Sequence, residues 1–397
     1  MRPLLTWGCG RLPSETAMHT QLADFLIEVR FRHLHAEHSL VSFYYCTVLI
    51  GCLNGRVLSS GAQLLFLMLR TRVPMRNIEL KDIEAARAAL PAPVRRTPII
   101  PLARDSAEIG RERCFLKCEN LQVTGAYKVR AAFTVLNALP EQARTKGVVL
   151  TSSGNFAQAF AYAGRTMEVP ITVVMLDHTS PYKVAATEGH GAKIHFCGTD
   201  ALERQPTVER LAGEGGLTAI DTWEEPQITA GHGSIGLEIM EDFPNVQQVL
   251  VPVSSGGGAS GISTAIKHLR PDVKVIGVQP ERANAAYVSL REGEPVTIDY
   301  WDSIADGLSA VRPGAFPFRH LQRYLDGIVL ISEADIASAF CTLLYRAKIL
   351  VEPAGVVATA AFLAGKVDTS LKTVAIVTGG NLSPETMRQL IEMAEMA

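Results

Sequence analysis

The chain has 397 residues, of which 47% are hydrophobic, and its formal net charge is −2 at neutral pH. This length allows two domains with a large buried core, and the near balance of charges gives no electrostatic reason to expect nucleic acid as a partner. The seven cysteines are scattered and form no pair of CxxC motifs, so neither a disulfide framework nor a zinc site is indicated. Cys114 and Cys118 are expected in a strand or the core, and a reducing cytoplasm fits this cysteine usage.

Residues 1–74 show little helical or strand periodicity. They include an uncharged stretch, 39–55, whose 17 residues are marginal for a membrane span of about 20. The stretch also begins too far from the N-terminus for an ordinary signal peptide. Met75 then opens a pattern typical of an amphipathic helix. We therefore expect residues 1–74 to be a disordered extension or a mis-assigned upstream start, with a membrane anchor at 39–55 as the alternative.

From residue 75 onward, β-rich apolar runs alternate with helical patterns. The expected strands are 148–151, 171–176, 193–197, 249–253, 273–278, 327–331 and 373–378. The expected helices include 156–165, 234–242, 261–269, 333–346, 354–364 and 384–395. This alternation predicts an α/β fold with parallel sheets covered by helices on both faces. In such sheets a ligand sits beyond the carboxyl ends of the strands.

Lys128 follows a Thr-Gly turn and stands at the head of an alanine-rich helical pattern. A lysine held at a backbone bend can serve as a Schiff-base nucleophile. The alternative is an ordinary lysine in the first turn of a helix, which the motif by itself favours.

Ser152, Ser153, Gly154 and Asn155 occupy the next junction between a strand and a helix. Two hydroxyls, a glycine and a carboxamide at a helix start form a ready binding site for a carboxylate. A plain serine or asparagine N-cap is the alternative.

Ser254, Ser255, Gly256, Gly257 and Gly258 come directly after a strand and directly before a helix. Consecutive glycines let backbone N–H groups turn inward, and the helix start adds the positive end of its dipole, so this loop can cradle a phosphate. The same segment fits the Gly-x-Gly-x-x-Gly fingerprint of dinucleotide-binding folds. Taken alone, the segment favours a nicotinamide dehydrogenase about as strongly as any other phosphate-binding protein.

Thr378 places a hydroxyl at the end of a late strand, before a Gly-Gly-Asn turn. Taken in this order, the four motifs resemble the fold-type II pyridoxal-phosphate enzymes, in particular the threonine/serine dehydratase and serine racemase group. The resemblance spans roughly residues 75–397. It also includes 95–98, 228–235, 304–308 and 351–355. A dehydrogenase would explain neither Lys128 nor Thr378.

The resemblance implies an α/β, tryptophan synthase β-like fold of two domains. The large domain, which binds pyridoxal 5′-phosphate, would comprise 75–146 and 225–397, and the small domain would comprise 147–224. It further implies an amino-acid substrate and a homodimer, with neither nucleic acid nor a membrane as a partner.

The resemblance also assigns the cofactor contacts. Lys128 would form the Schiff base with the cofactor aldehyde and later take the substrate α-proton as a general base. The loop from Ser254 to Gly258 would hold the phosphate. Asn155 would donate to the ring hydroxyl, and Thr378 would face the pyridine nitrogen.

The substrate would lie against Ser152, Ser153, Gly154 and Asn155, with the first three residues gripping its carboxylate. Ser153 has a second implied role, because a serine on the opposite face of the cofactor from the lysine could act as an acid or base in racemisation.

This chain departs from the family pattern at several positions. Phe156 stands where histidine is usual and Tyr127 where phenylalanine is usual, and both changes favour a bulkier or less polar β-substituent than that of serine. The metal-activated members carry acids where this chain has Gln279 and Ala285, so no metal site is expected, with Glu281 as the one alternative ligand.

The resemblance therefore implies a cytoplasmic lyase that converts threonine, serine or a related β-hydroxy amino acid, such as a phenylserine-type compound, to a 2-oxo acid and ammonia. An amino-acid racemase is the close alternative. A relative that binds cofactor without turnover and an NAD-binding dehydrogenase are the distant ones.

Overall fold

The structure is a computed structural model that describes residues 76–102 and 113–396. The chain divides after Pro74, and Met75–Ala397 forms one compact unit. The expectations for residues 1–74, including the uncharged stretch 39–55, concern residues outside this description. Within the described ranges, no helix is both long and apolar enough to cross a membrane.

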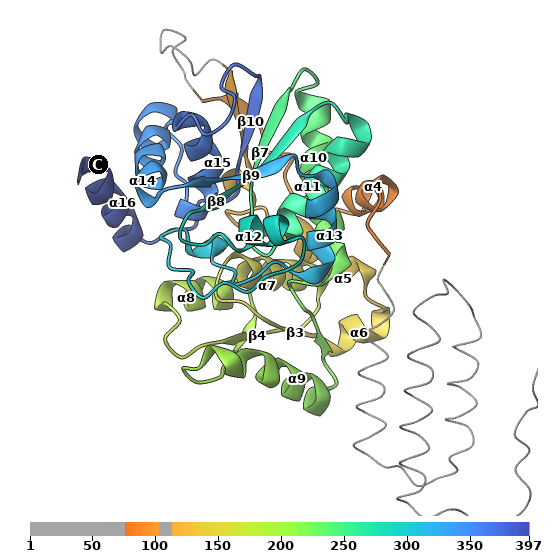
Figure 1. Ribbon diagram of the computed structural model, residues 1–397. Helices are drawn as coiled ribbons and strands as arrows, with labels where there is room; N and C mark the ends of the chain where they lie inside the picture. The colour runs from red at the N-terminus through yellow and green to blue at the C-terminus, as the bar shows by residue number, and fades with distance from the viewer. Residues whose placement is uncertain (1–75, 103–112, 397) are drawn as a thin grey trace, which may run out of the picture. The chain divides into compact units, whose positions relative to one another are not determined.

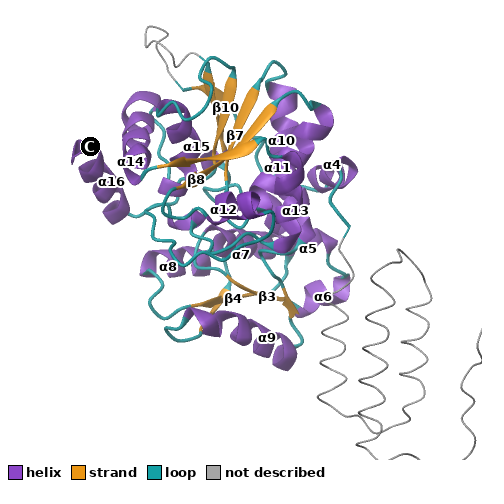
Figure 2. Cartoon of the chain, viewed as in Figure 1, coloured by secondary structure: helices purple, strands orange, loops and turns teal. Residues whose placement is uncertain are grey.

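Two sheets organise the unit (Figures 1 and 2). The six-stranded sheet has the order β1-β2-β10-β7-β8-β9 and the four-stranded sheet the order β5-β4-β3-β6. The larger contains β1 (Ile99–Pro101), β2 (Cys114–Cys118), β7 (Gln248–Pro252), β8 (Lys274–Pro280), β9 (Gly327–Ile331) and β10 (Thr373–Val377). The smaller contains β3 (Val148–Thr151), β4 (Ile171–Met175), β5 (Lys193–Phe196) and β6 (Thr218–Ala219). All neighbours are parallel except β1 and β2, which pair antiparallel.

Helices cover the sheets and connect their strands. The α-helices are α4 (Leu80–Ala88), α5 (Lys128–Ala138), α6 (Glu141–Lys146), α7 (Asn155–Met167), α8 (Pro181–Gly189), α9 (Arg204–Gly215), α10 (Pro226–Asp242), α11 (Gly257–Leu269), α12 (Ala285–Glu292), α13 (Ala315–Tyr324), α14 (Glu333–Thr342), α15 (Pro353–Leu363) and α16 (Pro384–Met396). Short turns of other helix types are η2 (Glu119–Leu121), η3 (Ala201–Glu203), η4 (Asp306–Leu308) and the π-turn η5 (Leu343–Ala347).

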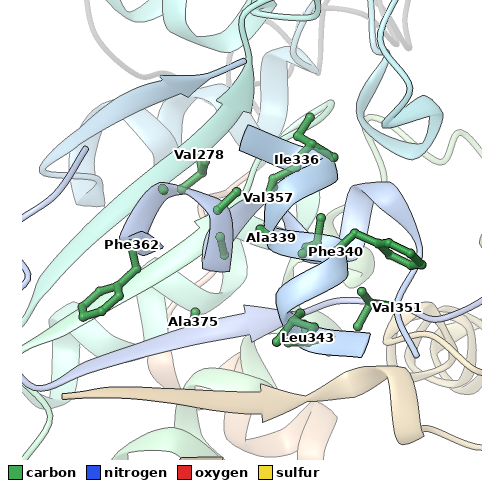
Figure 3. Close-up of a cluster of buried hydrophobic side chains, with 14 of the residues drawn as sticks. Val278, Ile336, Ala339, Phe340, Leu343, Val351, Val357, Phe362 and Ala375 are labelled. Carbon is green, nitrogen blue, oxygen red and sulfur yellow. The ribbon is translucent and has the colours of Figure 1, made fainter. Parts of the chain in front are cut away.

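The larger sheet has a hydrophobic core on each face. On one face, α14 and α15 pack over the strands through residues such as Phe340, Val357 and Phe362 (Figure 3). On the other, α10 and α11 pack through Ile235 and Ile262. Every residue of α15 from Pro353 to Phe362 is buried, which explains why its sequence is apolar on all sides.

The smaller sheet is likewise covered on two sides. On one side, Leu150 of β3 and Val173 of β4 pack with α7 through Phe160. Val149 and Val174 point to the other face and pack with α9 through Val208. Alternate residues of β3 and β4 therefore serve opposite cores, as the two-residue repeat of a strand requires.

The sequence predictions of β3 and β9 are confirmed at both ends, and those of the other expected strands differ by one or two residues. Cys114 and Cys118 lie buried in β2 as expected. Two helices begin at least four residues earlier than predicted, α10 at Pro226 and α11 at Gly257. These two helices pack so closely that position 261 requires glycine, because a Cβ on Gly261 would lie 2.0 Å from the Thr229 carbonyl oxygen.

Candidate active site

The turn before Lys128 is bonded to the end of β10. Tyr127 N donates to the Thr378 carbonyl oxygen over 3.1 Å, so the chain segments that carry Lys128 and Thr378 are adjacent. Gly125 has φ +72°, and a Cβ there would lie 2.3 Å from Asn381 Oδ1. Only glycine can therefore form this turn, for both conformational and steric reasons.

Lys128 begins α5, and its amine sits among aromatic side chains. Its Nζ lies 2.8 Å from Tyr127 Oη, 4.4 Å from the centre of the Tyr127 ring and 4.3 Å from that of Phe156. No acidic side chain within the described ranges forms an ion pair with it. An amine held by a phenol and two aromatic faces, without a carboxylate partner, is suited to nucleophilic and base chemistry.

His232 of α10 completes this aromatic group. Its ring lies 4.4 Å from that of Tyr127 and 5.9 Å from that of Phe156, between centroids. Burial and then the nearby charge of Lys128 lower the pKa of His232 well below its ordinary value. The imidazole is therefore neutral and adds no positive charge beside Lys128.

The glycine loop lies against the same tyrosine. Gly256 has φ +105° and precedes α11, whose first-turn amides have no acceptor within the helix. A Cβ on Gly258 would lie 2.8 Å from Tyr127 Oη. The hydroxyls of Ser254 and Ser255, partly exposed in this loop, bond to no other group in the described part of the chain.

The loop before α7 leads into Phe156, whose ring contacts Lys128. Gly154 N donates to Ser152 Oγ over 3.3 Å, and Asn155 opens the helix. Asn381 Nδ2 donates to Asn155 Oδ1 over 2.9 Å, although the two residues are 226 positions apart. Asn155 Nδ2 donates in turn to Glu352 Oε1 over 2.7 Å.

Arg204, at the start of α9, contacts this loop. Its Nη2 donates to Ser153 Oγ over 3.1 Å, and its Nε is buried without a hydrogen-bond partner among the described residues. Burial lowers the pKa of this guanidinium from its ordinary value, although it remains a cation. The loop before α7 thus has a cation beside it.

A buried ion network anchors α5 behind Lys128. Arg130 pairs with Glu119 over 2.8 Å and with Glu238 over 2.7 Å, and Lys117 pairs with Glu238 over 2.6 Å. All four side chains are almost fully buried. Because α10 and the residue after β2 supply the two carboxylates, the network holds the first turn of α5 against both elements.

The side chain of Gln279 forms hydrogen bonds to two backbone groups. In metal-activated members of the resembled family, an acid stands at this position. Gln279 Oε1 accepts from Tyr287 N over 2.8 Å, and its Nε2 donates to the Val253 carbonyl oxygen over 3.3 Å, one residue before Ser254. The described ranges contain no cluster of three or more His, Cys, Asp or Glu side chains that could hold a metal.

These observations fit pyridoxal phosphate. The cofactor needs an amine for its aldehyde, and Lys128 supplies one without a competing acid. It also needs donors for a phosphate, which the free amides of α11 and the serine hydroxyls provide. The glycine at 258 leaves open the space beside Tyr127 that a side chain would fill.

Several residues of this site could not be identified from the sequence motifs. Arg204 has no local signal, because it lies in a polar helix far from any motif. His232 and Glu352 belong to stretches that carried the family resemblance, but no role followed from their positions. The one sequence signal for Glu352 is that an acid directly precedes a proline at the start of a helix.

Known proteins share this fold and its motifs. Residues 90–379 match the family described as pyridoxal-phosphate dependent enzyme. The chain is 38% identical to the L-threonine ammonia-lyase of Geobacter sulfurreducens over 305 residues, which covers 77% of this chain and 76% of the relative.

Solved structures agree with this result. The processed form of threonine deaminase isoform 2 from Solanum lycopersicum has a TM-score of 0.75 and 28% identity, and the match covers 81% of this chain and 98% of that one. Maize serine racemase has a TM-score of 0.75 and 27% identity, with 81% and 99% covered. The fold, the lysine site and the family match lead to one conclusion: the chain belongs to the pyridoxal-phosphate dependent enzymes, of fold type II.

Proposed function

We propose that the protein is a pyridoxal-phosphate-dependent ammonia-lyase acting on threonine, serine or a related β-hydroxy amino acid. The observation that carries this proposal is the position of Lys128 between a phosphate-type cradle and Thr378, a hydroxyl instead of a carboxylate. Similarity to an L-threonine ammonia-lyase over three quarters of the chain supports it. The reaction releases water and then takes up water, so the products are a 2-oxo acid and ammonia.

When bound, pyridoxal phosphate supplies an aldehyde for Schiff-base formation and a ring that withdraws electrons from the α-carbon. In our proposal, residues 254–258 hold its phosphate, Asn155 donates to its ring hydroxyl and Thr378 faces its pyridine nitrogen. A hydroxyl leaves that nitrogen largely unprotonated. This favours departure of a β-substituent over transamination, which needs a longer-lived carbanion.

Lys128 is the proposed general base for the α-proton. Tyr127 Oη, 2.8 Å from Nζ, orients the amine, and the Tyr127 and Phe156 rings shield it from water. The neutral ring of His232 packs behind them without adding a charge.

The substrate carboxylate is proposed to bind at Ser152, Ser153 and Gly154, where α7 begins. Arg204 extends this set, since its guanidinium already donates to Ser153 Oγ. A cation next to donors at a helix start gives a carboxylate both charge and hydrogen bonds.

Phe156 and Tyr127 are the proposed determinants of the β-substituent. Phe156 presents an aromatic face 4.3 Å from Lys128 Nζ, where a histidine would place a polar ring. An apolar surface at this point favours a methyl or aryl group on the β-carbon over hydrogen. Threonine and phenylserine-type compounds are therefore preferred to serine.

Racemisation is the second candidate. Its support is the hydrogen bond from Arg204 to Ser153 Oγ, which leaves the proton of the serine hydroxyl free to be donated elsewhere. A serine so placed could exchange a proton on the face opposite Lys128. The similarity to maize serine racemase is compatible with this activity.

We also propose the division into a large domain (75–146 and 225–397) and a small domain (147–224). All four strands of the smaller sheet fall within 147–224, and all strands of the larger sheet fall outside it. A cytoplasmic location is supported by the free state of Cys114, Cys118, Cys197 and Cys341. The homodimer remains a proposal from the family resemblance, and light scattering of the purified protein tests it.

The function is tested with the purified full chain and pyridoxal phosphate, given L-threonine, L-serine and phenylserine in turn. The proposal predicts 2-oxo acid and ammonia in equal amounts, with threonine or phenylserine turned over faster than serine. D-amino acid without 2-oxo acid, measured by chiral chromatography, would identify a racemase. Bound cofactor with neither product would identify a binding protein.

A further inference from the structure

Glu352 is a buried carboxylic acid at the site to which the proposed mechanism gives no role. It directly precedes α15, yet its side chain does not cap that helix. Its Oε1 instead accepts a hydrogen bond from Asn155 Nδ2 over 2.7 Å, from a residue 197 positions away. Its backbone N donates to the Gly379 carbonyl oxygen over 3.0 Å, one residue beyond Thr378.

Asn381 and Glu352 together fix how the Asn155 amide is oriented, because each bonds to one end of it. Asn155 Oδ1 accepts from Asn381 Nδ2 over 2.9 Å, and Asn381 Nδ2 also donates to the Thr124 carbonyl oxygen over 2.8 Å. A reversed Asn155 would set an NH₂ group against the NH₂ group of Asn381. In the observed orientation, one N–H of Asn155 goes to Glu352 and one remains for a ligand.

The chain makes room for this carboxyl. A Cβ on Gly379 would lie 2.2 Å from Glu352 Oε1. Glycine at 379 is thus required by the position of the acid, although its backbone has no left-handed φ.

The charged groups around Glu352 come from three elements. Lys183 of α8 and Asp306 of η4 pair with each other over 2.6 Å, and Lys128 of α5 is the third charged group that acts on Glu352. Burial, with a further contribution from Asp306, raises the pKa of Glu352 to about 8, against opposing effects of the Asn155 hydrogen bond and the two lysines. The side chain is therefore a neutral acid near neutral pH.

We propose that Glu352 is a positioning residue that acts through Asn155, holding its amide so that one N–H is directed to the ring hydroxyl of the cofactor. This inference rests on the proposed function, because that function assigns Asn155 to the ring hydroxyl. Ionisation of Glu352 places a negative charge next to this contact. The visible absorbance of bound cofactor therefore changes as Glu352 loses its proton.

The same acid links stability to pH without cofactor. The folded chain keeps a proton that the unfolded chain releases between its ordinary pKa of 4.5 and about 8. The folded state then binds more protons, so the free energy of unfolding falls as the pH rises through this window. A variant without this acid lacks that component of the pH dependence.

The test compares the full-length protein with Glu352→Gln, which keeps an acceptor but cannot ionise, and Glu352→Leu, which removes the acceptor. Glu225→Gln is the matched control, since Glu225 is another partly buried acid with a raised pKa and caps α10 away from Asn155. The measurements are the dissociation constant of pyridoxal phosphate, the absorbance of the bound cofactor from about pH 6 to about pH 9, and the melting temperature of the cofactor-free protein over the same range.

We expect Glu352→Gln to bind cofactor within about threefold of the parent protein but to lose a spectral transition near pH 8. Glu352→Leu should bind about tenfold more weakly, the effect of one lost hydrogen bond. Glu225→Gln should keep both the affinity and the spectral transition.

Two results would overturn the inference while leaving the proposed function intact. Parental affinity and an unchanged spectral transition in both Glu352 variants would show that the acid does not act on the cofactor contact. If Glu352→Leu does not fold, an unchanged transition in Glu352→Gln alone decides against the inference. A parent protein that binds no pyridoxal phosphate would overturn the proposed function as well.

Discussion

Arg204 Nη2 donates a hydrogen bond to Ser153 Oγ over 3.1 Å, which connects α9 to the loop before α7 across 51 positions of sequence. The guanidinium forms no ion pair with an acid in the described ranges, and its Nε is buried without a partner. A half-buried cation without a protein anion is available to a carboxylate ligand.

Replacement of Arg204 by glutamine is therefore expected to raise KM for the amino acid by about 10- to 100-fold, the usual effect of losing a hydrogen bond to a charged group. The effect on kcat should be smaller, since in our proposal the guanidinium binds the carboxylate in both the ground state and the transition state. Arg210→Gln on the same helix is the control, because Arg210 is exposed and pairs with Glu214. Equal KM values for the two variants would contradict the assignment.

Replacement of Lys128 by alanine should abolish covalent attachment of cofactor and its visible absorbance. Turnover should fall by at least about 10²- to 10⁴-fold, because a positioned base contributes that much alone. Lys193→Ala, at an exposed position of β5, should retain both properties. Absorbance that borohydride bleaches equally in both variants would show that another lysine binds the cofactor.

The buried network behind α5 predicts a large effect on stability. Glu238→Ala leaves Arg130 without one carboxylate and Lys117 without its ion-pair partner, both inside the core, so the free energy of unfolding should fall by about 3–5 kcal/mol. Glu241→Ala is the matched control on the same helix: its pairs with Arg87 and Arg96 are exposed and should contribute about 0–1 kcal/mol. Urea unfolding of the cofactor-free protein measures both, and similar values would refute the distinction.

Chelators should leave activity and melting temperature essentially unchanged. Gln279 offers hard cations no carboxylate oxygen, and its side-chain amide already bonds to Tyr287 N and the Val253 carbonyl. Activity is measured with and without EDTA and after addition of Mg²⁺. Clear activation by Mg²⁺ would show that Glu281 or backbone carbonyls form a site after all.

A protein that begins at Met75 should fold, bind cofactor and turn over substrate like the full chain. Met75–Ala397 forms one compact unit and carries every proposed contact to cofactor and substrate. Loss of folding on truncation would show that residues 1–74 belong to the core. Pellet-bound activity of the full chain that truncation releases would instead support a membrane anchor at 39–55.

The sequence by itself determined the fold class and the positions of the motifs. Runs such as 148–151 and 327–331 are apolar and β-rich, and the strands β3 and β9 have these bounds. Local sequence is sufficient here because short apolar runs between turn residues are typical of strands. The hydroxyl and glycine motifs follow such strands, so their place at the carboxyl edges could be inferred before any contact was known.

Only the tertiary structure decided which side chains meet. The antiparallel pairing of β1 with β2, the bond from Asn155 to Glu352 and the bond from Arg204 to Ser153 depend on how distant segments pack. Local periodicity cannot encode contacts between segments that are distant in sequence. The same is true of the environment of Glu352: the burial that raises its pKa and the space that Gly379 leaves for its carboxyl exist only in the folded chain.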